Sequence, residues 1–295
     1  MDVVEIEGST VAHPGGSPMN VSLGLARLGI PVTFGTALGD DEFGHAISAH
    51  LEGSGVRMLA GPEAGRRTSS ARVTLDSSGV PEYLFDVDWT PDFSAVSVRE
   101  PIHVHIGSIG AFLLPGAEAV DAIVQAAVPT ATVSYDPNIR PQFLSSPAEA
   151  VGAVERQLLL CDIVKASDED VAWLYPGLSL EVVARHWRKL GPAIVVITRG
   201  GDGAILLCAA GELSVPGLVV DVVDSIGAGD AFMSGLIAGL HRRGLTGSDG
   251  RVALATIALE MAHEVLEIAT VCGAMTVARA GAQPPRREDL PTGVW

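Results

Sequence analysis

Residues 224–232 read Asp-Ser-Ile-Gly-Ala-Gly-Asp-Ala-Phe, and they carry more structural information than any other stretch of the chain. The small residues Gly227, Ala228 and Gly229 stand directly before an apolar run with helical spacing. Small side chains let backbone N–H groups approach a ligand, and a helix start favours negative charge. Asp230 falls in the first helical turn, where its carboxylate can accept a proton from an attacking hydroxyl. The stretch predicts an anion hole beside a general base, although a plain helix start with an Asp favoured by the dipole stays open.

Helical and strand patterns alternate along the rest of the 295 residues, which is typical of one α/β domain with a mainly parallel sheet. The expected helices are 19–28, 43–51, 117–127, 180–190, 229–241 and 252–270. The expected strands are 32–38, 56–60, 68–75, 82–87, 102–106, 131–135, 162–165, 193–198, 204–208 and 212–215. The runs 68–75 and 82–87 flank the turn Asp76-Ser77-Ser78-Gly79, which predicts a hairpin that projects from the main sheet.

Composition excludes several classes of protein. Hydrophobic residues make up 47% of the chain and charged residues 18%, which supports a packed core and excludes a disordered chain. Nineteen Lys and Arg against 35 Asp and Glu give a net charge of −16, so nucleic acid and membrane are poor partners. Cys161, Cys208 and Cys272 are isolated, which predicts a cytoplasmic protein without disulfides or a zinc site.

A second informative stretch is Gly15-Gly16-Ser17-Pro18-Met19-Asn20, which leads into the first expected helix. The two glycines allow close backbone approach, and Asn20 can bind sugar hydroxyls through both amide atoms. An ordinary turn with an Asn near a helix start is the alternative.

Together, the two stretches resemble the two signatures of the ribokinase-like (PfkB) sugar kinase family. Residues 15–20, followed by Gly29 and Gly39, are similar to the N-terminal signature, and residues 224–230 are similar to the C-terminal one. The resemblance covers nearly the whole chain. It implies a ribokinase-like three-layer αβα sandwich over residues 1–295, with a small β-sheet lid formed mainly by about 8–16 and 66–92.

The resemblance also implies Mg²⁺-dependent transfer of the ATP γ-phosphate to a sugar hydroxyl. Asp230 would be the base, and the amides of Gly227, Ala228 and Gly229 would form the anion hole. The implied sugar-binding residues are Asp2, Gly15, Gly16, Asn20, Asn138 and Arg140. The implied ATP-binding residues are Lys165, Ser167, Thr198, Gly200 and Gly203, the last three from a stretch that resembles the family's nucleotide turn.

Two metal positions follow from the resemblance. The family's Asn-x-x-Glu near Mg²⁺ is replaced by residues 167–170, Ser-Asp-Glu-Asp, in which Asp170 keeps a carboxylate for Mg²⁺ contact through water. Residues 165–169 resemble the Lys-x-Ser-Asp-Glu of bacterial fructokinases. Asp224 resembles the family's monovalent-cation ligand, which suggests K⁺, although an Asp here can equally cap the turn.

The family's usual first strand, which lies in the central sheet and ends in Gly-Glu-x-x-x-Asp, has no counterpart before Asp2. We therefore expect Asp2 to be that sugar-binding Asp with its strand missing, and a gap in the central sheet. The alternative is that Asp2 belongs to a frayed terminus.

Fructose is the favoured sugar, with fructose 6-phosphate as product. Residues 135–140 resemble the Asp-Pro-Asn-x-Arg of fructokinases and 2-keto-3-deoxygluconate kinases, so Asn138 and Arg140 are expected to face the cleft; a plain strand-end turn is the alternative. A kinase for 2-keto-3-deoxygluconate or another small sugar stays open, with Arg66 and Arg67 as candidates to bind a carboxylate.

From a different class, a non-catalytic sugar- or nucleotide-binding regulator is the rival, supported by Ser167, Asp170 and the missing strand and opposed by Asp230. His103 and His105 share one side of an expected strand, and packing is favoured over metal binding. An exposed lid sheet offers an edge for pairing, which predicts a homodimer through the lids.

Overall fold

The computed structural model describes residues 1–6, 9–75, 81–93 and 101–295. The turn expected at residues 76–79 lies outside this range. The strands are β1 (Asp2–Ile6), β2 (Ser9–His13), β3 (Thr33–Phe34), β4 (Arg57–Met58), β5 (Ser70–Leu75), β6 (Pro81–Asp86), β7 (His103–Gly107), β8 (Thr132–Asp136), β9 (Ile163–Ser167), β10 (Ile194–Thr198), β11 (Ala204–Cys208) and β12 (Gly211–Val215). The helices are α1 (Ser17–Arg27), α2 (Glu42–Glu52), α3 (Gly116–Ala127), α4 (Pro147–Leu158), α5 (Asp168–Leu174), α6 (Leu180–Leu190), α7 (Ala228–Arg242), α8 (Gly247–Ala255) and α9 (Leu259–Val277).

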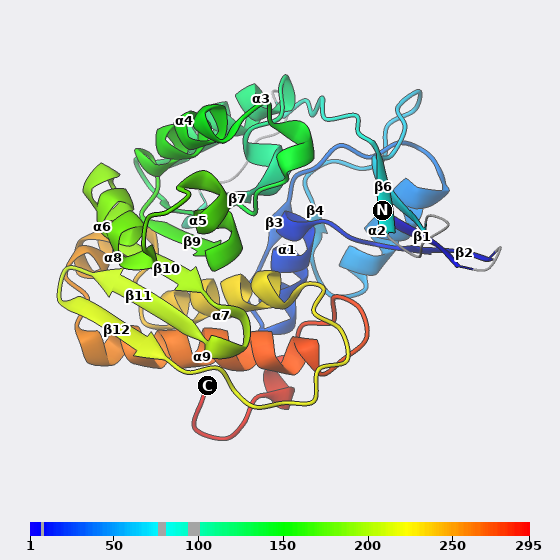
Figure 1. The fold of residues 1–295 in the computed structure, drawn as a ribbon. Coiled ribbons are helices and arrows are strands. Elements are labelled where there is room, and N and C mark those ends of the chain that lie inside the picture. The colour runs from blue at the N-terminus through cyan, green and yellow to red at the C-terminus, as the bar shows by residue number, and fades with distance from the viewer. Residues whose placement is uncertain (7–8, 76–80, 94–100) are drawn as a thin grey trace.

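A six-stranded sheet in the order β12-β11-β10-β9-β8-β7 forms the centre of the molecule (Figure 1). The strands from β7 to β10 are parallel, and β11 and β12 add an antiparallel edge. Helices connect the parallel strands, as this geometry requires. The α/β prediction with a mainly parallel sheet is confirmed.

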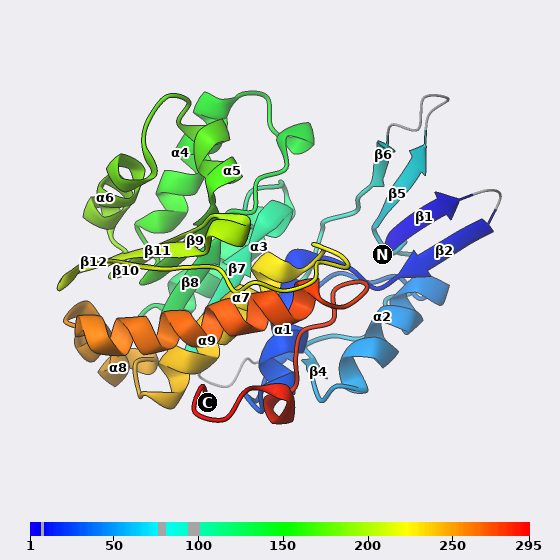
Figure 2. The ribbon, with the colours of Figure 1, turned by 60° about the horizontal axis from the view of Figure 1, so that its bottom comes forward.

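Both faces of this sheet are covered by helices, which makes three layers (Figure 2). Along β10, Ile194 and Val196 join the core beneath α1, α7, α8 and α9, while Val195 and Ile197 join the core beneath α3, α4, α5 and α6. All four side chains are almost fully buried. A strand buried on both faces reads as a continuous apolar run, as β10 does.

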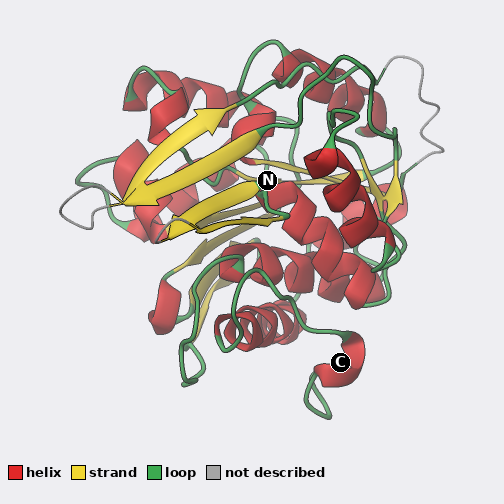
Figure 3. Ribbon diagram, turned by 90° about the vertical axis from the view of Figure 1, so that its right-hand side faces the viewer, coloured by secondary structure: helices red, strands yellow, loops and turns green. Residues whose placement is uncertain are grey.

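A small four-stranded sheet in the order β2-β1-β5-β6 stands beside the sandwich, and Figure 3 views the molecule from its side. The β5–β6 pair is the expected hairpin, and its strands pair from Ser70 with Asp86 to Leu75 with Pro81. Strand β2 lies in the segment of about 8–16 that was expected in the small sheet, whereas β1 was not expected; β1 pairs antiparallel with β2 and parallel with β5. The role of this sheet as a lid stays a prediction.

The edge of the central sheet at β7 is relevant to the expected gap in that sheet. Within the described residues, β7 pairs only with β8, and β3 and β4 form a separate two-stranded sheet. Residues of β7 and of β3 line the same large cavity. The expected gap in the central sheet stays a prediction.

Three expected elements differ clearly in extent. The helix expected over 252–270 is two helices, because the chain turns at residues 256–258 and places Ile257 in the core. The strands expected over 32–38 and 56–60 shrink to β3 and β4, because these two strands pair over only two positions. Helix α4 was not expected, although Ser146 caps it by accepting a hydrogen bond from the Glu149 amide. Among the described helices, none is long and apolar enough to cross a membrane.

Candidate active site

The start of α7 is the centre of the candidate site. Gly227 is the residue before the helix and has a φ of 76°, a left-handed conformation that favours glycine. A side-chain carbon at Gly227 would lie 2.6 Å from the Cβ of Ala282, so both conformation and space require glycine here. Asp230 lies in the first turn, with only 8% of its surface exposed.

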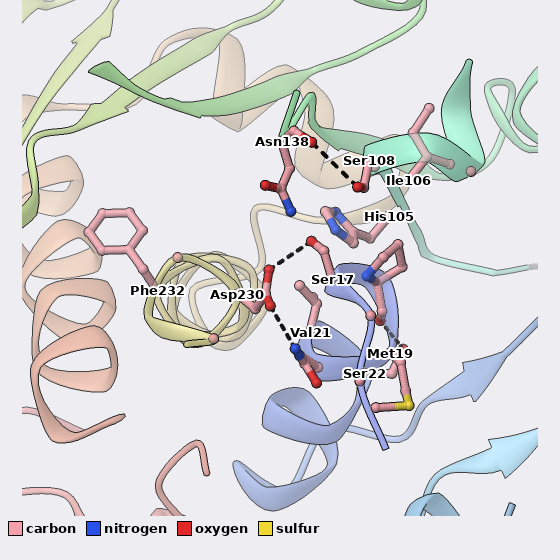
Figure 4. A pocket seen from close by; sticks show the side chains of 18 of the residues that line it. Ser17, Met19, Val21, Ser22, His105, Ile106, Ser108, Asn138, Asp230 and Phe232 are labelled. Atoms are coloured by element: carbon pink, nitrogen blue, oxygen red, sulfur yellow. Dashed lines mark hydrogen bonds between the residues drawn. The ribbon is translucent and has the colours of Figure 1, made fainter. Parts of the chain in front are cut away.

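The first turn of α1 faces Asp230 (Figure 4). The Ser17 hydroxyl donates to Oδ1 of Asp230 at 2.7 Å, and Nδ2 of Asn20 donates to Oδ2 at 2.8 Å. Both donors are buried. Oδ1 of Asn20 is also buried and has no partner in the described structure. It is therefore an acceptor that a hydroxyl of a bound polyol can satisfy.

Close packing of α1 on α7 creates this contact. A side-chain carbon at Gly24 of α1 would collide with the hydroxyl of Ser234 on α7. The glycine therefore lets the two helices cross closely enough for their first turns to meet. Gly16, directly before α1, has a φ of 128° and redirects the chain into the helix.

A buried ion pair lies beneath the start of α7. Nζ of Lys165 on β9 donates to Oδ2 of Asp136 on β8 at 2.9 Å, and both side chains are almost fully buried. Burial alone would lower the pKa of Lys165, but the carboxylates of Asp136 and Asp230 outweigh it, so this pKa is raised. Burial raises the pKa of Asp136 to about 6 against the pull of Lys165.

Lys165 therefore carries a permanent positive charge at the candidate anion site. A side-chain carbon at Gly229 would lie 3.0 Å from Nζ of Lys165, so the ammonium group faces the backbone of the first helical turn. A cation and a helix start at one point favour a phosphate group. Sequence reasoning placed Lys165 among the ATP-binding residues but missed its partner, Asp136.

Asn138 and Arg140 line the same cavity and bind each other. Nη1 of Arg140 donates to Oδ1 of Asn138 at 2.7 Å and to the carbonyl of Ile139 at 2.9 Å. Asn138 has a φ of 38°, an uncommon value for a residue other than glycine. Such backbone conformations often occur at functional sites, which agrees with the predicted position of this turn at the cleft.

Asp170, the predicted Mg²⁺ residue, forms a capping box with Ser167. The Ser167 hydroxyl accepts from the Asp170 amide at 3.0 Å, and Oδ2 of Asp170 accepts from the Ser167 amide at 3.1 Å. Oδ1 accepts from the amide of Ile139 at 2.8 Å. Each oxygen keeps a further lone pair, so contact with a hydrated cation stays chemically available. The Ser-x-x-Asp spacing was a readable signal for this cap.

Asp2 lies against the Gly15-Gly16 turn. A side-chain carbon at Gly15 would collide with the Asp2 carboxylate, so glycine is required at this place. Burial raises the pKa of Asp2, while Arg140 and His13 act in the opposite direction. Asp2 pairs with His13 and Ala71 in the small sheet, and the N-terminal amine donates to the Ser69 carbonyl at 3.0 Å. The alternative of a frayed terminus is wrong in this structure.

The predicted nucleotide turn lies at the carboxyl end of β10. Thr198, Gly200 and Gly203 all line the cavity, and a side chain at Gly203 would collide with the Val215 carbonyl.

The Ala228 amide, predicted for the anion hole, donates to the Ser225 carbonyl at 3.3 Å, a weak bond that a ligand can replace.

Asp224 ties the loop before α7 to the segment that follows α9. Its Oδ1 accepts from the amide of Ile226 and its Oδ2 from that of Gly281, both at 2.9 Å. These bonds fit the capping role that the residues alone allowed. The monovalent-cation role stays a prediction.

His103 and His105 do share one side of β7. His103 contacts the hydroxyls of Thr132 and Ser134 at 2.9 and 2.8 Å, and Nδ1 of His105 contacts Ser134 at 2.9 Å. Across the described residues, no three His, Cys, Asp or Glu side chains group as a metal site. Hydrogen-bonded packing is the role that these contacts support.

The comparisons with known proteins establish the family of this chain. The chain is a carbohydrate kinase, that is, a phosphotransferase with an alcohol group as acceptor. It belongs to the pfkB family of carbohydrate kinases, whose sequence profile matches residues 2–289. Members of this family use ATP with a divalent metal ion.

Three relatives illustrate the match. A fructokinase of Klebsiella pneumoniae is 32% identical over 295 residues, covering 96% of this chain and 92% of the relative. A double mutant of fructokinase from Vibrio cholerae O395, solved with fructose, ADP and potassium ion bound, has a TM-score of 0.78 at 27% identity and covers 95% of this chain and 90% of its own. Aminoimidazole riboside kinase from Salmonella enterica, complexed with aminoimidazole riboside and an ATP analog, has a TM-score of 0.75 at 27% identity, covering 95% and 91%.

Proposed function

We propose that this protein is an ATP- and Mg²⁺-dependent fructokinase that converts fructose to fructose 6-phosphate. The observation that carries the proposal is the buried carboxylate of Asp230 at the start of α7, held by Ser17 and Asn20 and close to the buried ammonium of Lys165. A base, an anion-binding helix start and a fixed cation are the groups that phosphoryl transfer requires.

In the proposed mechanism, Asp230 accepts the proton of the sugar hydroxyl as that oxygen attacks the γ-phosphorus in line. The bond from phosphorus to the ADP oxygen breaks as the new bond forms. The amides of Gly227, Ala228 and Gly229, together with Lys165, stabilise the charge on the transferred phosphoryl group. The small sheet would close over the sugar and exclude water, which prevents wasteful hydrolysis of ATP.

A neutral sugar fits the site better than a keto-acid. Arg66 already pairs with Glu63 at 3.1 Å and with Asp88 at 3.3 Å, and Arg67 pairs with Asp86 at 3.0 Å. A carboxylate substrate would have to displace these partners, which disfavours 2-keto-3-deoxygluconate. A riboside remains the second candidate, because a structurally similar relative was solved with aminoimidazole riboside.

The ions belong to the same proposal. Mg²⁺, bound with ATP, would neutralise phosphate charge, and Asp170 would hold it through water with the lone pairs left by its capping bonds. Asp224 would contribute to a K⁺ site beside the loop before α7. A potassium ion in a fructokinase structure of similar fold supports this second assignment.

We further propose a homodimer that forms through the small sheet. Among the described residues, strands β2 and β6 are the two edge strands of this sheet, and each carries an exposed apolar side chain, Val11 at 49% and Leu84 at 66%. Edge strands with exposed apolar side chains favour association. Sedimentation at increasing protein concentration would detect the dimer, and a monomer at all concentrations would reject it.

The decisive experiment measures ADP release with ATP and Mg²⁺ against fructose, 2-keto-3-deoxygluconate, ribose, glucose and adenosine. We expect activity to peak on fructose. Asp230→Asn should lower turnover by about 10²–10⁴-fold, the usual contribution of a general base, while ATP still binds in calorimetry. Asp249→Asn, at the exposed start of α8, is the matched control and should keep normal turnover.

The outcomes separate the parts of the proposal. A peak on another sugar would leave the kinase intact and reject fructose. Near-normal turnover of Asp230→Asn would reject Asp230 as the base.

A further inference from the structure

Ser17 makes a contact that its place in the helix does not require. It is the first residue of α1, only 8% of its surface is exposed, and its hydroxyl donates to Oδ1 of Asp230 at 2.7 Å. The residue at the cap position of α1 is Gly16, so the Ser17 hydroxyl does not cap the helix. The bond joins residues 213 positions apart and reaches only the candidate base.

We propose that Ser17 is a positioning residue that fixes the orientation of the Asp230 carboxylate for proton transfer. This inference rests on the proposed function, in which Asp230 is the base. A carboxylate turns about its Cβ–Cγ bond, and a single donor at one oxygen leaves much of that rotation free. Asn20 binds Oδ2 and Ser17 binds Oδ1, so together they set the plane of the group.

This arrangement leaves the carboxylate able to react. Each carboxylate oxygen accepts about two hydrogen bonds, so Oδ1 and Oδ2 each keep a lone pair for the sugar hydroxyl. The two donors lie on one face of the first turn of the same helix, at positions 17 and 20. A short O–H···O⁻ bond is charge-assisted and stronger than a bond between neutral groups. Ser17 therefore favours the correctly turned orientation of the base.

The same helix contains a matched control. Ser22 is equally buried, with 8% of its surface exposed, but its hydroxyl donates to the carbonyl of Pro18 within its own helix at 2.9 Å. Ser17→Ala and Ser22→Ala remove the same atom from one helix. Only the first removes a donor to Asp230.

The experiment compares steady-state kinetics with fructose and unfolding midpoints for the wild type, Ser17→Ala, Ser17→Thr and Ser22→Ala. Because a hydrogen bond to a charged group is worth more than a neutral one, we expect Ser17→Ala to lower kcat by about 10- to 100-fold. KM for the sugar should change by less than about threefold, and the unfolding midpoint should match that of Ser22→Ala. Ser17→Thr, which keeps the hydroxyl, should restore most of kcat.

Three results would overturn the inference. They are a normal kcat in Ser17→Ala, an equal loss of kcat in Ser22→Ala, and a rise in KM without loss of kcat, which would make Ser17 a sugar ligand instead. Asp230→Asn, measured in the same assays, distinguishes failure of this inference from failure of the proposed base. If it is inactive while Ser17→Ala is normal, only the inference fails; if it keeps turnover, the proposed base fails as well.

Discussion

Lowering the pH should destabilise this protein through two histidines on β7. His103 and His105 share the Ser134 hydroxyl as a partner, and burial lowers the pKa of each to about 3. The neighbouring His241 lowers the pKa of His103 further, and Lys165 has the same effect on His105. In the unfolded chain both rings have an ordinary pKa near 6.5.

The sign follows from proton binding. Between about pH 6.5 and pH 3, the unfolded chain binds protons at these rings and the folded chain does not, so the free energy of unfolding falls as the pH falls. At about pH 5.5 each ring favours the unfolded chain by roughly 1.4 kcal/mol, and the two together by about 3 kcal/mol. Near pH 7.5 their combined effect is only about 0.1 kcal/mol, so the two histidines lower the free energy of unfolding very little there.

Urea unfolding at the two pH values measures this effect. The double variant His103→Gln/His105→Asn keeps hydrogen-bonding groups but cannot titrate, so its loss of stability between about pH 7.5 and 5.5 should be smaller than that of the wild type by about 3 kcal/mol. His45→Asn, whose histidine side chain is 65% exposed, should behave like the wild type. Equal losses in the wild type and the double variant would refute the reasoning.

Two further substitutions test the candidate site. Lys165→Met leaves the Asp136 carboxylate buried without its partner, so we expect urea unfolding to show a free energy of unfolding that is lower by about 3–5 kcal/mol. Adding Asp136→Asn should recover part of this loss. No recovery would show that the two residues are not coupled. Gly227→Ala meets both an unfavourable φ and the Cβ of Ala282, so it should cost about 1–3 kcal/mol and slow phosphoryl transfer. Gly244→Ala, also at a positive φ but with open space around it, is its control, and an equal loss in both would discount the Ala282 contact.

The bounds of a helix or strand could be predicted where its own sequence determines where it begins and ends. Residues 180–190 and 204–208 were predicted with the bounds that the structure has, because Ser179 caps α6 and the apolar run of β11 is uninterrupted. Strand β1 was not predicted, since it lies between β2 and β5 and part of its pairing is with residues about 70 positions away. The break between α8 and α9 was missed because residues 252–270 favour helix throughout, and burial of Ile257 decides the turn.

In the candidate site, too, some features could be predicted from local sequence and others could not. Asp230, Asn20 and the glycines before each helix could be singled out from two local stretches of sequence, and the resemblance to both signatures supported that choice. Their direct contact was not, because it depends on how α1 crosses α7. The Asp136–Lys165 pair likewise depends on which strands are neighbours, and no spacing along the chain contains that information.

The contact between α1 and α7 also determines how late in synthesis the candidate site can form. Asn20 and Asp230 are 210 positions apart, and Val21 and Leu25 of α1 are buried in a core that α7 and α9 complete. At about 5–20 residues per second, a ribosome needs roughly 10–40 s to add α7 after α1. Throughout that interval the apolar face of α1 lacks its final partners and stays exposed. The candidate site, which joins residues 210 positions apart, can therefore form only after α7 has been made.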